Sequence, residues 1–199
     1  MSSSPSLEHM IDALKCLPGV GQKSAQRMAL HLIERDQEGL KKLAAAMLNA
    51  LDKVGHCHRC RNFADTELCR ICDSEKRTEG LLCIVETPAD VIAIEASGAY
   101  QGTYFVLLGR LSPLDGYGPE QIGLEVLEKR LQEEGVNEVI LATSATVEGD
   151  ITAQFIADIA RKYNLETSRL ARGIPIGGEL EYVDSGTLSR ALSGRQHYD

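Results

Sequence analysis

The sequence predicts an α/β fold in which a parallel sheet wrapped by helices follows a small helical unit and a cysteine-rich module. Up to about residue 54, the apolar residues keep helical spacing. Four of the six cysteines then fall within sixteen residues. From Leu81 onward, short apolar runs alternate with amphipathic stretches, which is the pattern of a parallel sheet with crossover helices. With 199 residues, the chain is long enough to bury a core without disulfide bonds.

Three helices are expected in the N-terminal part of the chain. Apolar residues keep helical spacing over residues 7–14, and the turn Leu-Pro-Gly-Val-Gly at 17–21 ends this run. A second helix is expected over about 22–35. A third is expected over about 40–54, where the apolar residues form one stripe along the helix.

Strands and helices alternate in the region that begins at Leu81. Four short apolar runs predict strands at 82–85, 104–108, 139–142 and 168–171. Amphipathic stretches between them predict helices at 88–97, 119–134 and 151–163. Pro88 and Pro119 suit the first turn of a helix, and Gly135 suits a C-terminal cap.

The chain after Ala171 is rich in glycine, and one further helix is expected there, at about 185–192. The run Leu-Glu-Tyr-Val-Asp at 180–184 is a weak match to a Walker-B motif, and we interpret it as a strand that ends in an acidic residue. The sequence contains no G-x-x-x-x-G-K-[ST] motif, so we do not expect an independent ATPase.

The charge is distributed unevenly along the chain. A formal net charge of -8 argues against a nucleic-acid partner, since DNA attracts basic surfaces. Residues 1–56, however, carry seven Lys or Arg against six Asp or Glu, and residues 57–80 carry five against five. The remaining residues carry nine against eighteen, so the excess of acid lies in the second part of the chain. We therefore expect any DNA contact within the first 80 residues.

The N-terminal segment does not have the pattern of a secretory signal, because no basic stretch is followed by an apolar one. No run approaches the roughly 18 apolar residues that a membrane span needs. We expect a cytoplasmic protein.

Two pairs of cysteines predict a metal site. Cys57, Cys60, Cys69 and Cys72 form a C-x2-C-x8-C-x2-C pattern, in which each pair can present two thiolates to one tetrahedral zinc ion. Four cysteine ligands leave no open coordination position, so the metal would support folding rather than catalysis. Redox-active thiols or unbonded buried cysteines are the alternatives, and His56 or His58 could replace a cysteine as ligand.

The glycine-containing turn at 17–21 resembles a helix-hairpin-helix motif. Gly19 and Gly21 permit a tight turn with outward backbone amides, and the positive end of the next helix lies close by, so a phosphate can dock without a base being read. Lys23 and Arg27 lie four residues apart on one face of that helix, where they can reach neighbouring phosphates. The alternative is an ordinary connection between two helices with solvated charges.

Acidic residues follow two of the predicted strands. Glu86 ends the first strand, and Glu148 and Asp150 come after the strand at 139–142. Ligands of open α/β sheets gather at the carboxyl ends of strands, so these acids could together hold a divalent cation such as Mg²⁺. The layout resembles the Toprim domain, in which a glutamate and a D-x-D pair bind magnesium, but here the pair is E-x-D. Asp90 is a further candidate, although it could simply favour the first turn of its helix.

Taken together and in this order, the hairpin, the cysteine module, the Toprim-like sheet and the tail resemble the RecR family of recombination mediators over essentially the whole chain. The tail reads GIPIGGELEYVDSGTLSRALSGR, at 173–195, and the stretch ATSATVEGDITAQFIADI, at 142–159, is also similar. Ser144 and Ala145 stand where the family pattern has Asn-Pro. The corresponding segments are a DNA-binding helix-hairpin-helix unit at 1–54, a zinc finger at 57–72, a Toprim domain at 80–175 and an oligomerisation or Walker-B-like tail at 176–199.

The resemblance implies a ring-like homo-oligomer, a tetramer, that binds DNA and acts with RecO, and sometimes RecF, to load RecA onto single strands coated by SSB. It also implies that Lys23 and Arg27 face DNA and that the four cysteines hold zinc. The Toprim acids would lie at the RecO contact or the DNA opening rather than cleave phosphodiesters, so the protein would not be an enzyme.

Two other classes of function stay open from the residues alone. A magnesium-dependent Toprim nuclease would use Glu86, Glu148 and Asp150 to hold the metal and would cut DNA. A zinc-stabilised interaction protein would show no salt-sensitive binding to DNA.

Overall fold

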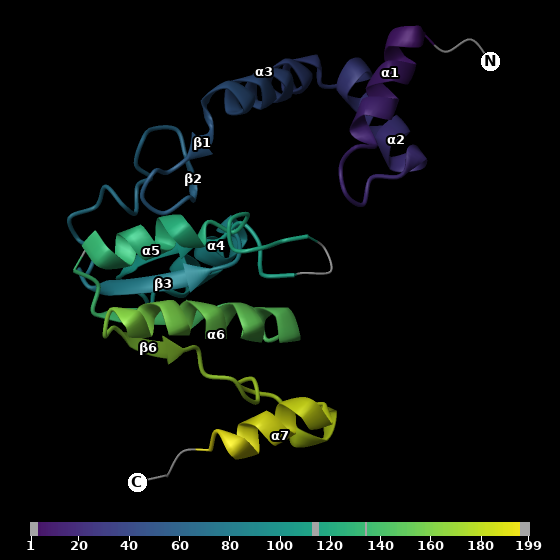
Figure 1. The fold of residues 1–199 in the computed structure, drawn as a ribbon. Coiled ribbons are helices and arrows are strands. Elements are labelled where there is room, and N and C mark those ends of the chain that lie inside the picture. The colour runs from purple at the N-terminus through teal and green to yellow at the C-terminus, as the bar shows by residue number, and fades with distance from the viewer. Residues whose placement is uncertain (1–3, 113–115, 134, 196–199) are drawn as a thin grey trace. The chain divides into compact units, whose positions relative to one another are not determined.

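The computed structural model describes residues 4–112, 116–133 and 135–195 of the chain. These residues form two compact units, which meet in the sequence between Val54 and Gly55 (Figure 1). The α/β fold class expected from the sequence is confirmed. Within the described residues, no helix combines the length and the apolar character needed to cross a membrane.

The first unit consists of three helices, α1 (Pro5–Leu14), α2 (Gln22–Glu34) and α3 (Gln37–Lys53). Its small core is formed by Ile11 of α1 together with Ala25 and Ala29 of α2. Helix α3 begins three residues earlier than expected because the side chain of Asp36 caps it by accepting a hydrogen bond from the amide of Gly39.

The expected apolar stripe of α3 is present, but it is exposed. In the described residues, none of the side chains of this helix is buried, and the outermost, Leu48 and Leu51, are 68% and 84% exposed. Such a stripe normally faces a core. Its exposure shows that the apolar face of α3 is left uncovered by the rest of its own unit.

The second unit is built on a parallel sheet of four strands in the order β4-β3-β5-β6. The strands are β3 (Leu81–Val85), β4 (Thr103–Val106), β5 (Glu138–Ala142) and β6 (Glu166–Arg169). Val85 at the end of β3 lies opposite Val106 on one side and Ala142 on the other, so these strands end at a common edge.

Strands β3 and β5 begin one residue earlier than expected, and the bounds of β4 and β6 differ more. Strand β4 ends at Val106, not at residue 108, because Leu108 adopts a φ of 60°, which a strand cannot continue. Strand β6 lies two residues earlier than expected, and its first amide, that of Glu166, bonds to the carbonyl oxygen of Asn137, the residue before β5. The carboxyl edge of the sheet is therefore followed by irregular chain that can carry a site.

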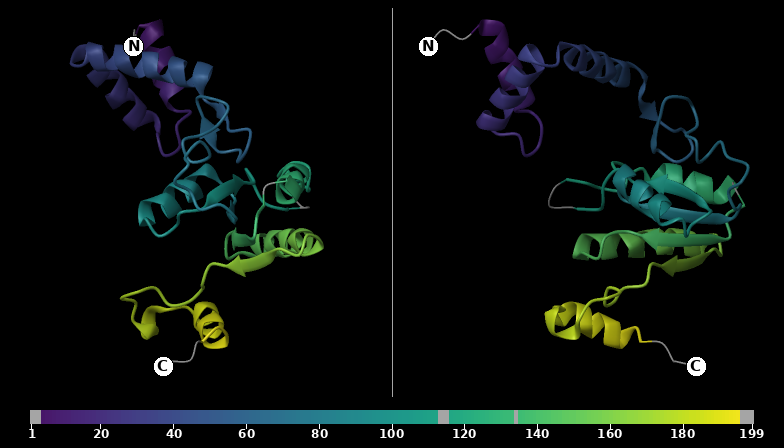
Figure 2. Two further views of the ribbon diagram at one scale, coloured as in Figure 1. Left: turned by 90° about the vertical axis from the view of Figure 1, so that its left-hand side faces the viewer. Right: turned by 180° about the vertical axis from the view of Figure 1, so that it is seen from behind.

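Helices cover both faces of this sheet, as Figure 2 (left) shows: α4 lies on one face and α5 and α6 lie on the other. Alternate residues of β3 serve the two layers, since Leu82 and Ile84 join the core under α5 and α6, whereas Cys83 and Val85 pack with Val91 of α4. The helices are α4 (Pro88–Ser97), α5 (Leu124–Glu133) and α6 (Val147–Lys162).

Helix α4 has the expected bounds, but α5 and α6 begin elsewhere. Helix α5 starts at Leu124 rather than at residue 119, because Gly123 has a φ of 73° and interrupts the turns that precede it. Helix α6 starts four residues early, because the Thr146 side chain caps it by accepting a hydrogen bond from the amide of Gly149. This places Glu148 and Asp150 in the first turn of a helix rather than in a loop.

The last segment holds a short 3-10 helix, η2 (Leu180–Tyr182), and helix α7 (Ser185–Ser193). The strand expected at 180–184 is wrong. Local hydrogen bonds close tight turns here, such as the bond from the amide of Val183 to the carbonyl oxygen of Leu180. Asp184 is not the terminal acid of a strand but the N-cap of α7, where it accepts the amide of Thr187.

Candidate metal centre and nucleic-acid interface

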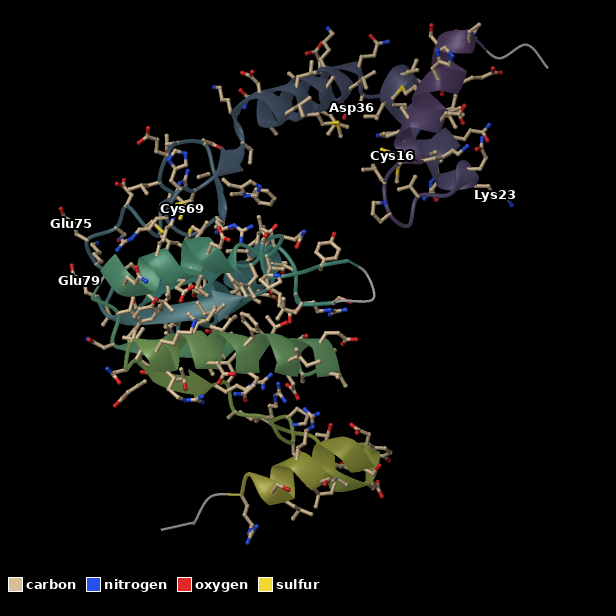
Figure 3. The ribbon with its side chains drawn as sticks, viewed as in Figure 1. Cys16, Lys23, Asp36, Cys69, Glu75 and Glu79 are labelled. Carbon is tan, nitrogen blue, oxygen red and sulfur yellow. The ribbon has the colours of Figure 1, made fainter. Side chains whose placement is uncertain are left out.

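The four predicted cysteines come together in a module that opens the second unit. A short antiparallel pair, β1 (Gly55–His56) and β2 (Phe63–Ala64), brackets the first CxxC pair. All four cysteines are buried, and their sulfur atoms lie within 4.8 Å of one another. The sulfur atoms are grouped beside the labelled Cys69 in Figure 3.

This sulfur set fits zinc. Four thiolates that converge on one point are the ligand set of a closed, tetrahedral structural zinc site. Sγ of Cys60 and Sγ of Cys69 are 3.5 Å apart, which brings the two CxxC pairs together across the module. His56 and His58 are both exposed, and neither belongs to the cluster. The structural zinc site predicted from the cysteine spacing is therefore confirmed.

The backbone around the first CxxC pair forms a tight knuckle. The amide of Arg61 donates to the carbonyl oxygen of Cys57, and the amide of Cys57 donates to that of Asn62. Arg61 takes a φ of 63°, an uncommon conformation for a residue with a side chain. The knuckle turns the chain sharply enough for both thiols to face inward.

Hydrogen bonds hold the zinc module against β4 at the edge of the sheet. The carbonyl oxygen of Cys60 accepts the amide of Val106 at 2.8 Å. The guanidinium of Arg61 donates to the carbonyl oxygens of Leu107 and Ile122, and it lies 5.7 Å from the centre of the Phe105 ring. Burial lowers the pKa of Arg61 from its ordinary value.

A second arginine, which belongs to the sheet domain, reaches across to the zinc module. Arg130 of α5 is 5% exposed, and its guanidinium donates to the carbonyl oxygens of Arg59 and Tyr104 at 3.0 and 2.6 Å. In the sequence, Arg61 and Arg130 are indistinguishable from surface charges. Only the fold shows that both are structural.

The hairpin turn has the backbone that its glycines predict. Gly19 has a φ of 78°, the left-handed region that other residues avoid, and Gly21 is the extended N-cap of α2. No atom lies within 4 Å of a Cβ built on either glycine, so the turn is open on its outer side. Gly21 has no side chain to cap the first amides of α2, which leaves them to an external acceptor.

Lys23 and Arg27 lie one turn apart near the start of α2, and both are exposed. Figure 3 labels Lys23 on this helix. The two side chains line one open groove of about 490 Å³, together with Gln26, Leu30, His31, Glu34 and Arg35. Two cations beside free helix-terminal amides form a surface that suits phosphate.

The four acids that the sequence suggested as cation ligands are each bonded to other groups or lie apart from the rest. Glu86 is 9% exposed, and one of its oxygens accepts the amide and the hydroxyl of Ser144, both at 2.8 Å. Asp90 forms a capping box with Thr87 at the start of α4, which is the structural role considered for it. Glu148 lies half-buried in the first turn of α6.

Asp150 is surrounded by arginines. Its Oδ1 accepts Nη2 of Arg169 at 2.5 Å and Nη2 of Arg172 at 2.6 Å, and its Oδ2 lies 3.8 Å from Arg190. The guanidinium of Arg172, followed by that of Arg169, lowers the pKa of this carboxyl to about 2. Among the described residues, the four cysteines are the one group of potential metal ligands that converges on a point.

A helical hairpin, a four-cysteine zinc module and a Toprim-like parallel sheet in one chain are typical of proteins that act on nucleic acids. Comparison with family models agrees segment by segment. Residues 7–51 match the RecR helix-hairpin-helix, 54–74 the RecR zinc finger domain with four cysteines, 80–171 the Toprim domain and 173–196 the RecR C-terminal model. The chain belongs to the RecR family, as its resemblance predicted, and this supports a recombination-mediator role in DNA repair.

Proposed function

We propose that this protein is a DNA-binding recombination mediator that acts with RecO, and with RecF in some settings, to load RecA onto single-stranded DNA coated by SSB. The observation that carries the proposal is the succession of four family segments, three of them particular to RecR, along residues 7–196. The protein itself holds DNA and partners and does not cut the DNA.

The hairpin is the proposed DNA contact. The free amides at the start of α2 and the guanidinium and ammonium groups of Arg27 and Lys23 favour phosphate oxygens over base edges, so binding is independent of sequence. One hairpin offers few phosphate contacts. Affinity therefore depends on several hairpins engaging one DNA molecule, which an oligomer provides.

The exposed apolar stripe of α3 supports self-association. A helix whose Leu48 and Leu51 are mostly exposed gains stability when a second copy covers it. A ring-like homotetramer would place four hairpins on one DNA molecule and multiply the weak contacts of each.

The carboxyl edge of the sheet is proposed as a partner surface rather than a catalytic centre. A Toprim nuclease needs acids that are free to hold Mg²⁺, whereas Glu86 is bonded to Ser144 and Asp150 to arginines. The E-x-D pair also departs from the usual acid pair. Glu86, Asp90, Glu148 and Asp150 then mark the edge of the sheet on which RecO is proposed to dock.

The decisive experiment measures loading directly. RecA hydrolyses ATP once it is assembled on single-stranded DNA, so its ATPase on SSB-coated DNA reports mediator activity. Adding this protein with RecO should shorten the lag before RecA begins to hydrolyse ATP. With the Lys23→Ala, Arg27→Ala double variant, the lag should be as long as it is without this protein. An unchanged lag with wild-type protein and RecO would reject the mediator function.

A further inference from the structure

Three arginines from the last part of the second unit meet at one carboxylate. Arg169 ends β6, Arg172 follows three residues later and Arg190 lies on α7. All three approach Asp150, at 2.5, 2.6 and 3.8 Å. This part of the chain is acidic on average, so the sequence alone does not reveal the local concentration of positive charge.

The local charges do not balance. Three guanidinium groups face the single carboxylate of Asp150, and another nearby acid, Asp184, is engaged in capping α7 through Thr187. Glu86, which is joined to the cluster through Ser144, pairs with Arg110, so these three acids face four arginines and one positive charge remains. Nε of Arg169 is also buried with no hydrogen-bond partner among the described residues. The cluster therefore has cationic donors to spare.

Two of these arginines line a cavity of about 510 Å³ between the body of the sheet domain and α7. Its other lining residues are mostly small, namely Ala145, Ala171, Gly173, Asp184, Gly186 and Thr187. Arg172 is 25% and Arg190 48% exposed at the side chain, so both can be reached from solvent. Planar guanidinium forks suit the oxygens of a phosphate group.

We propose that this cavity is a phosphate-binding site in which Arg172 and Arg190 contact the anion. The carboxylate of Asp150 competes with the anion for these arginines. It holds the guanidinium groups in place in the free protein, and its ion pairs with them weaken when phosphate binds. The phosphate belongs either to the backbone of a bound nucleic acid or to a free nucleoside triphosphate. The site does not depend on the hairpin's function.

The test removes the hairpin's contribution first. In the Lys23→Ala, Arg27→Ala background, binding of a fluorescein-labelled oligothymidylate is measured by anisotropy, and binding of ATP in EDTA by calorimetry. The double variant Arg172→Gln, Arg190→Gln should bind whichever of the two probes uses the site about tenfold more weakly. If that probe is the oligonucleotide, the slope of log affinity against log salt should fall by about 1.4, that is, about 0.7 for each of two phosphates.

A matched control carries the same charge change elsewhere. Arg161→Gln with Lys162→Gln alters two exposed cations on α6, which pair with Asp158 and Glu128, and should leave both affinities unchanged. Asp150→Asn removes the competitor and should raise affinity severalfold. That variant also decides the matter if the double arginine variant fails to fold by circular dichroism.

Each outcome separates the possibilities. Weaker oligonucleotide binding in the arginine variant assigns the site to nucleic acid, and weaker ATP binding alone assigns it to nucleotide. Unchanged affinity for both probes in the folded arginine variant, or in Asp150→Asn, overturns the proposal. The hairpin's role is judged independently, by comparing the wild type with the background variant.

Discussion

The carbonyl oxygen of Cys60 accepts a 2.8 Å hydrogen bond from the amide of Val106, so a zinc-ligand residue is bonded directly to the edge strand of the sheet. An edge strand presents unpaired backbone groups unless something covers it. Here the zinc module provides the cover. The metal site and the sheet should therefore lose their structure together.

Zinc removal is expected to destabilise the second unit as a whole. Replacing Cys57 and Cys60 with Ser should lower the melting temperature by at least about 20 °C, since roughly 1 kcal/mol shifts it by about 2–4 °C in a protein of this size and a structural zinc ion contributes about 10–16 kcal/mol of folding free energy. The measurements are circular dichroism and elemental analysis. A folded, soluble wild-type preparation without metal would contradict the zinc assignment.

Arg61→Ala is expected to lower the free energy of unfolding by about 2–3 kcal/mol, because it leaves the carbonyl oxygens of Leu107 and Ile122 without their charged donor. Urea titration of the second unit measures this effect. Arg70→Ala, a change at an exposed site in the same module, is the control and should alter stability by less than about 0.5 kcal/mol. Equal stability of the two variants would show that Arg61 does not hold the module to the sheet.

Lys23→Ala with Arg27→Ala is expected to weaken DNA binding across unrelated sequences. Each phosphate contact contributes roughly 0.7 to 0.9 to the slope of log affinity against log salt, so the slope should fall by about 1.4 to 1.8 per hairpin. Zinc content and oligomer size should stay the same. The exposed pair Lys41→Ala with Lys42→Ala carries the same charge change and serves as control.

Full affinity and slope in the Lys23 and Arg27 variant would move the DNA site elsewhere. The zinc module is the next region to test, but Arg61 is bonded to the sheet and Arg77 is paired with Glu95. Arg70 and Lys76 are the exposed cations that remain there.

We expect neither nuclease nor topoisomerase turnover. Plasmid incubated with the purified protein and Mg²⁺ or Mn²⁺ should keep its topology and length on a gel, because Glu86 and Asp150 are committed to internal partners. Cleavage by the wild type that disappears in Glu86→Gln would establish the enzyme interpretation instead.

The ion pairs of Asp150 predict a pH dependence of stability. Its pKa in the folded protein is about 2, below the ordinary value of 3.8, so its contribution is present above about pH 4 and is lost as the pH falls towards 2. Asp150→Asn should therefore lower the urea midpoint at pH 6, with the difference from wild type shrinking between pH 4 and pH 2. A difference that stays constant over this interval would show that the carboxylate charge is not responsible.

Local patterns in the sequence were enough to predict most elements of the fold. Helix α4 has the expected bounds because Pro88, the Thr87 cap and Gly98 mark its two ends within the segment itself. The zinc site could also be predicted from the sequence, since two CxxC pairs can meet over a short connection. The hairpin turn followed from Gly19, whose φ of 78° few other residues tolerate.

The elements expected from the sequence were wrong where distant contacts or side-chain contacts set the structure. The early start of α6 depends on the Thr146 cap, and it changed the setting of Glu148 and Asp150 from a loop to a helix. The strand expected at 180–184 became a 3-10 turn and a helix cap, since no neighbouring strand pairs with it in the described sheet.

The sequence by itself determined the order of the modules, the metal ligands and the family, because these depend on spacing and on residue type. The tertiary structure alone decided the roles of the arginines. Arg61 and Arg130 join the zinc module to the sheet, whereas Arg169 and Arg172 surround Asp150. A guanidinium at the end of a long side chain takes its role from whichever acceptor the fold brings within reach, and that acceptor is up to 71 residues away in the chain.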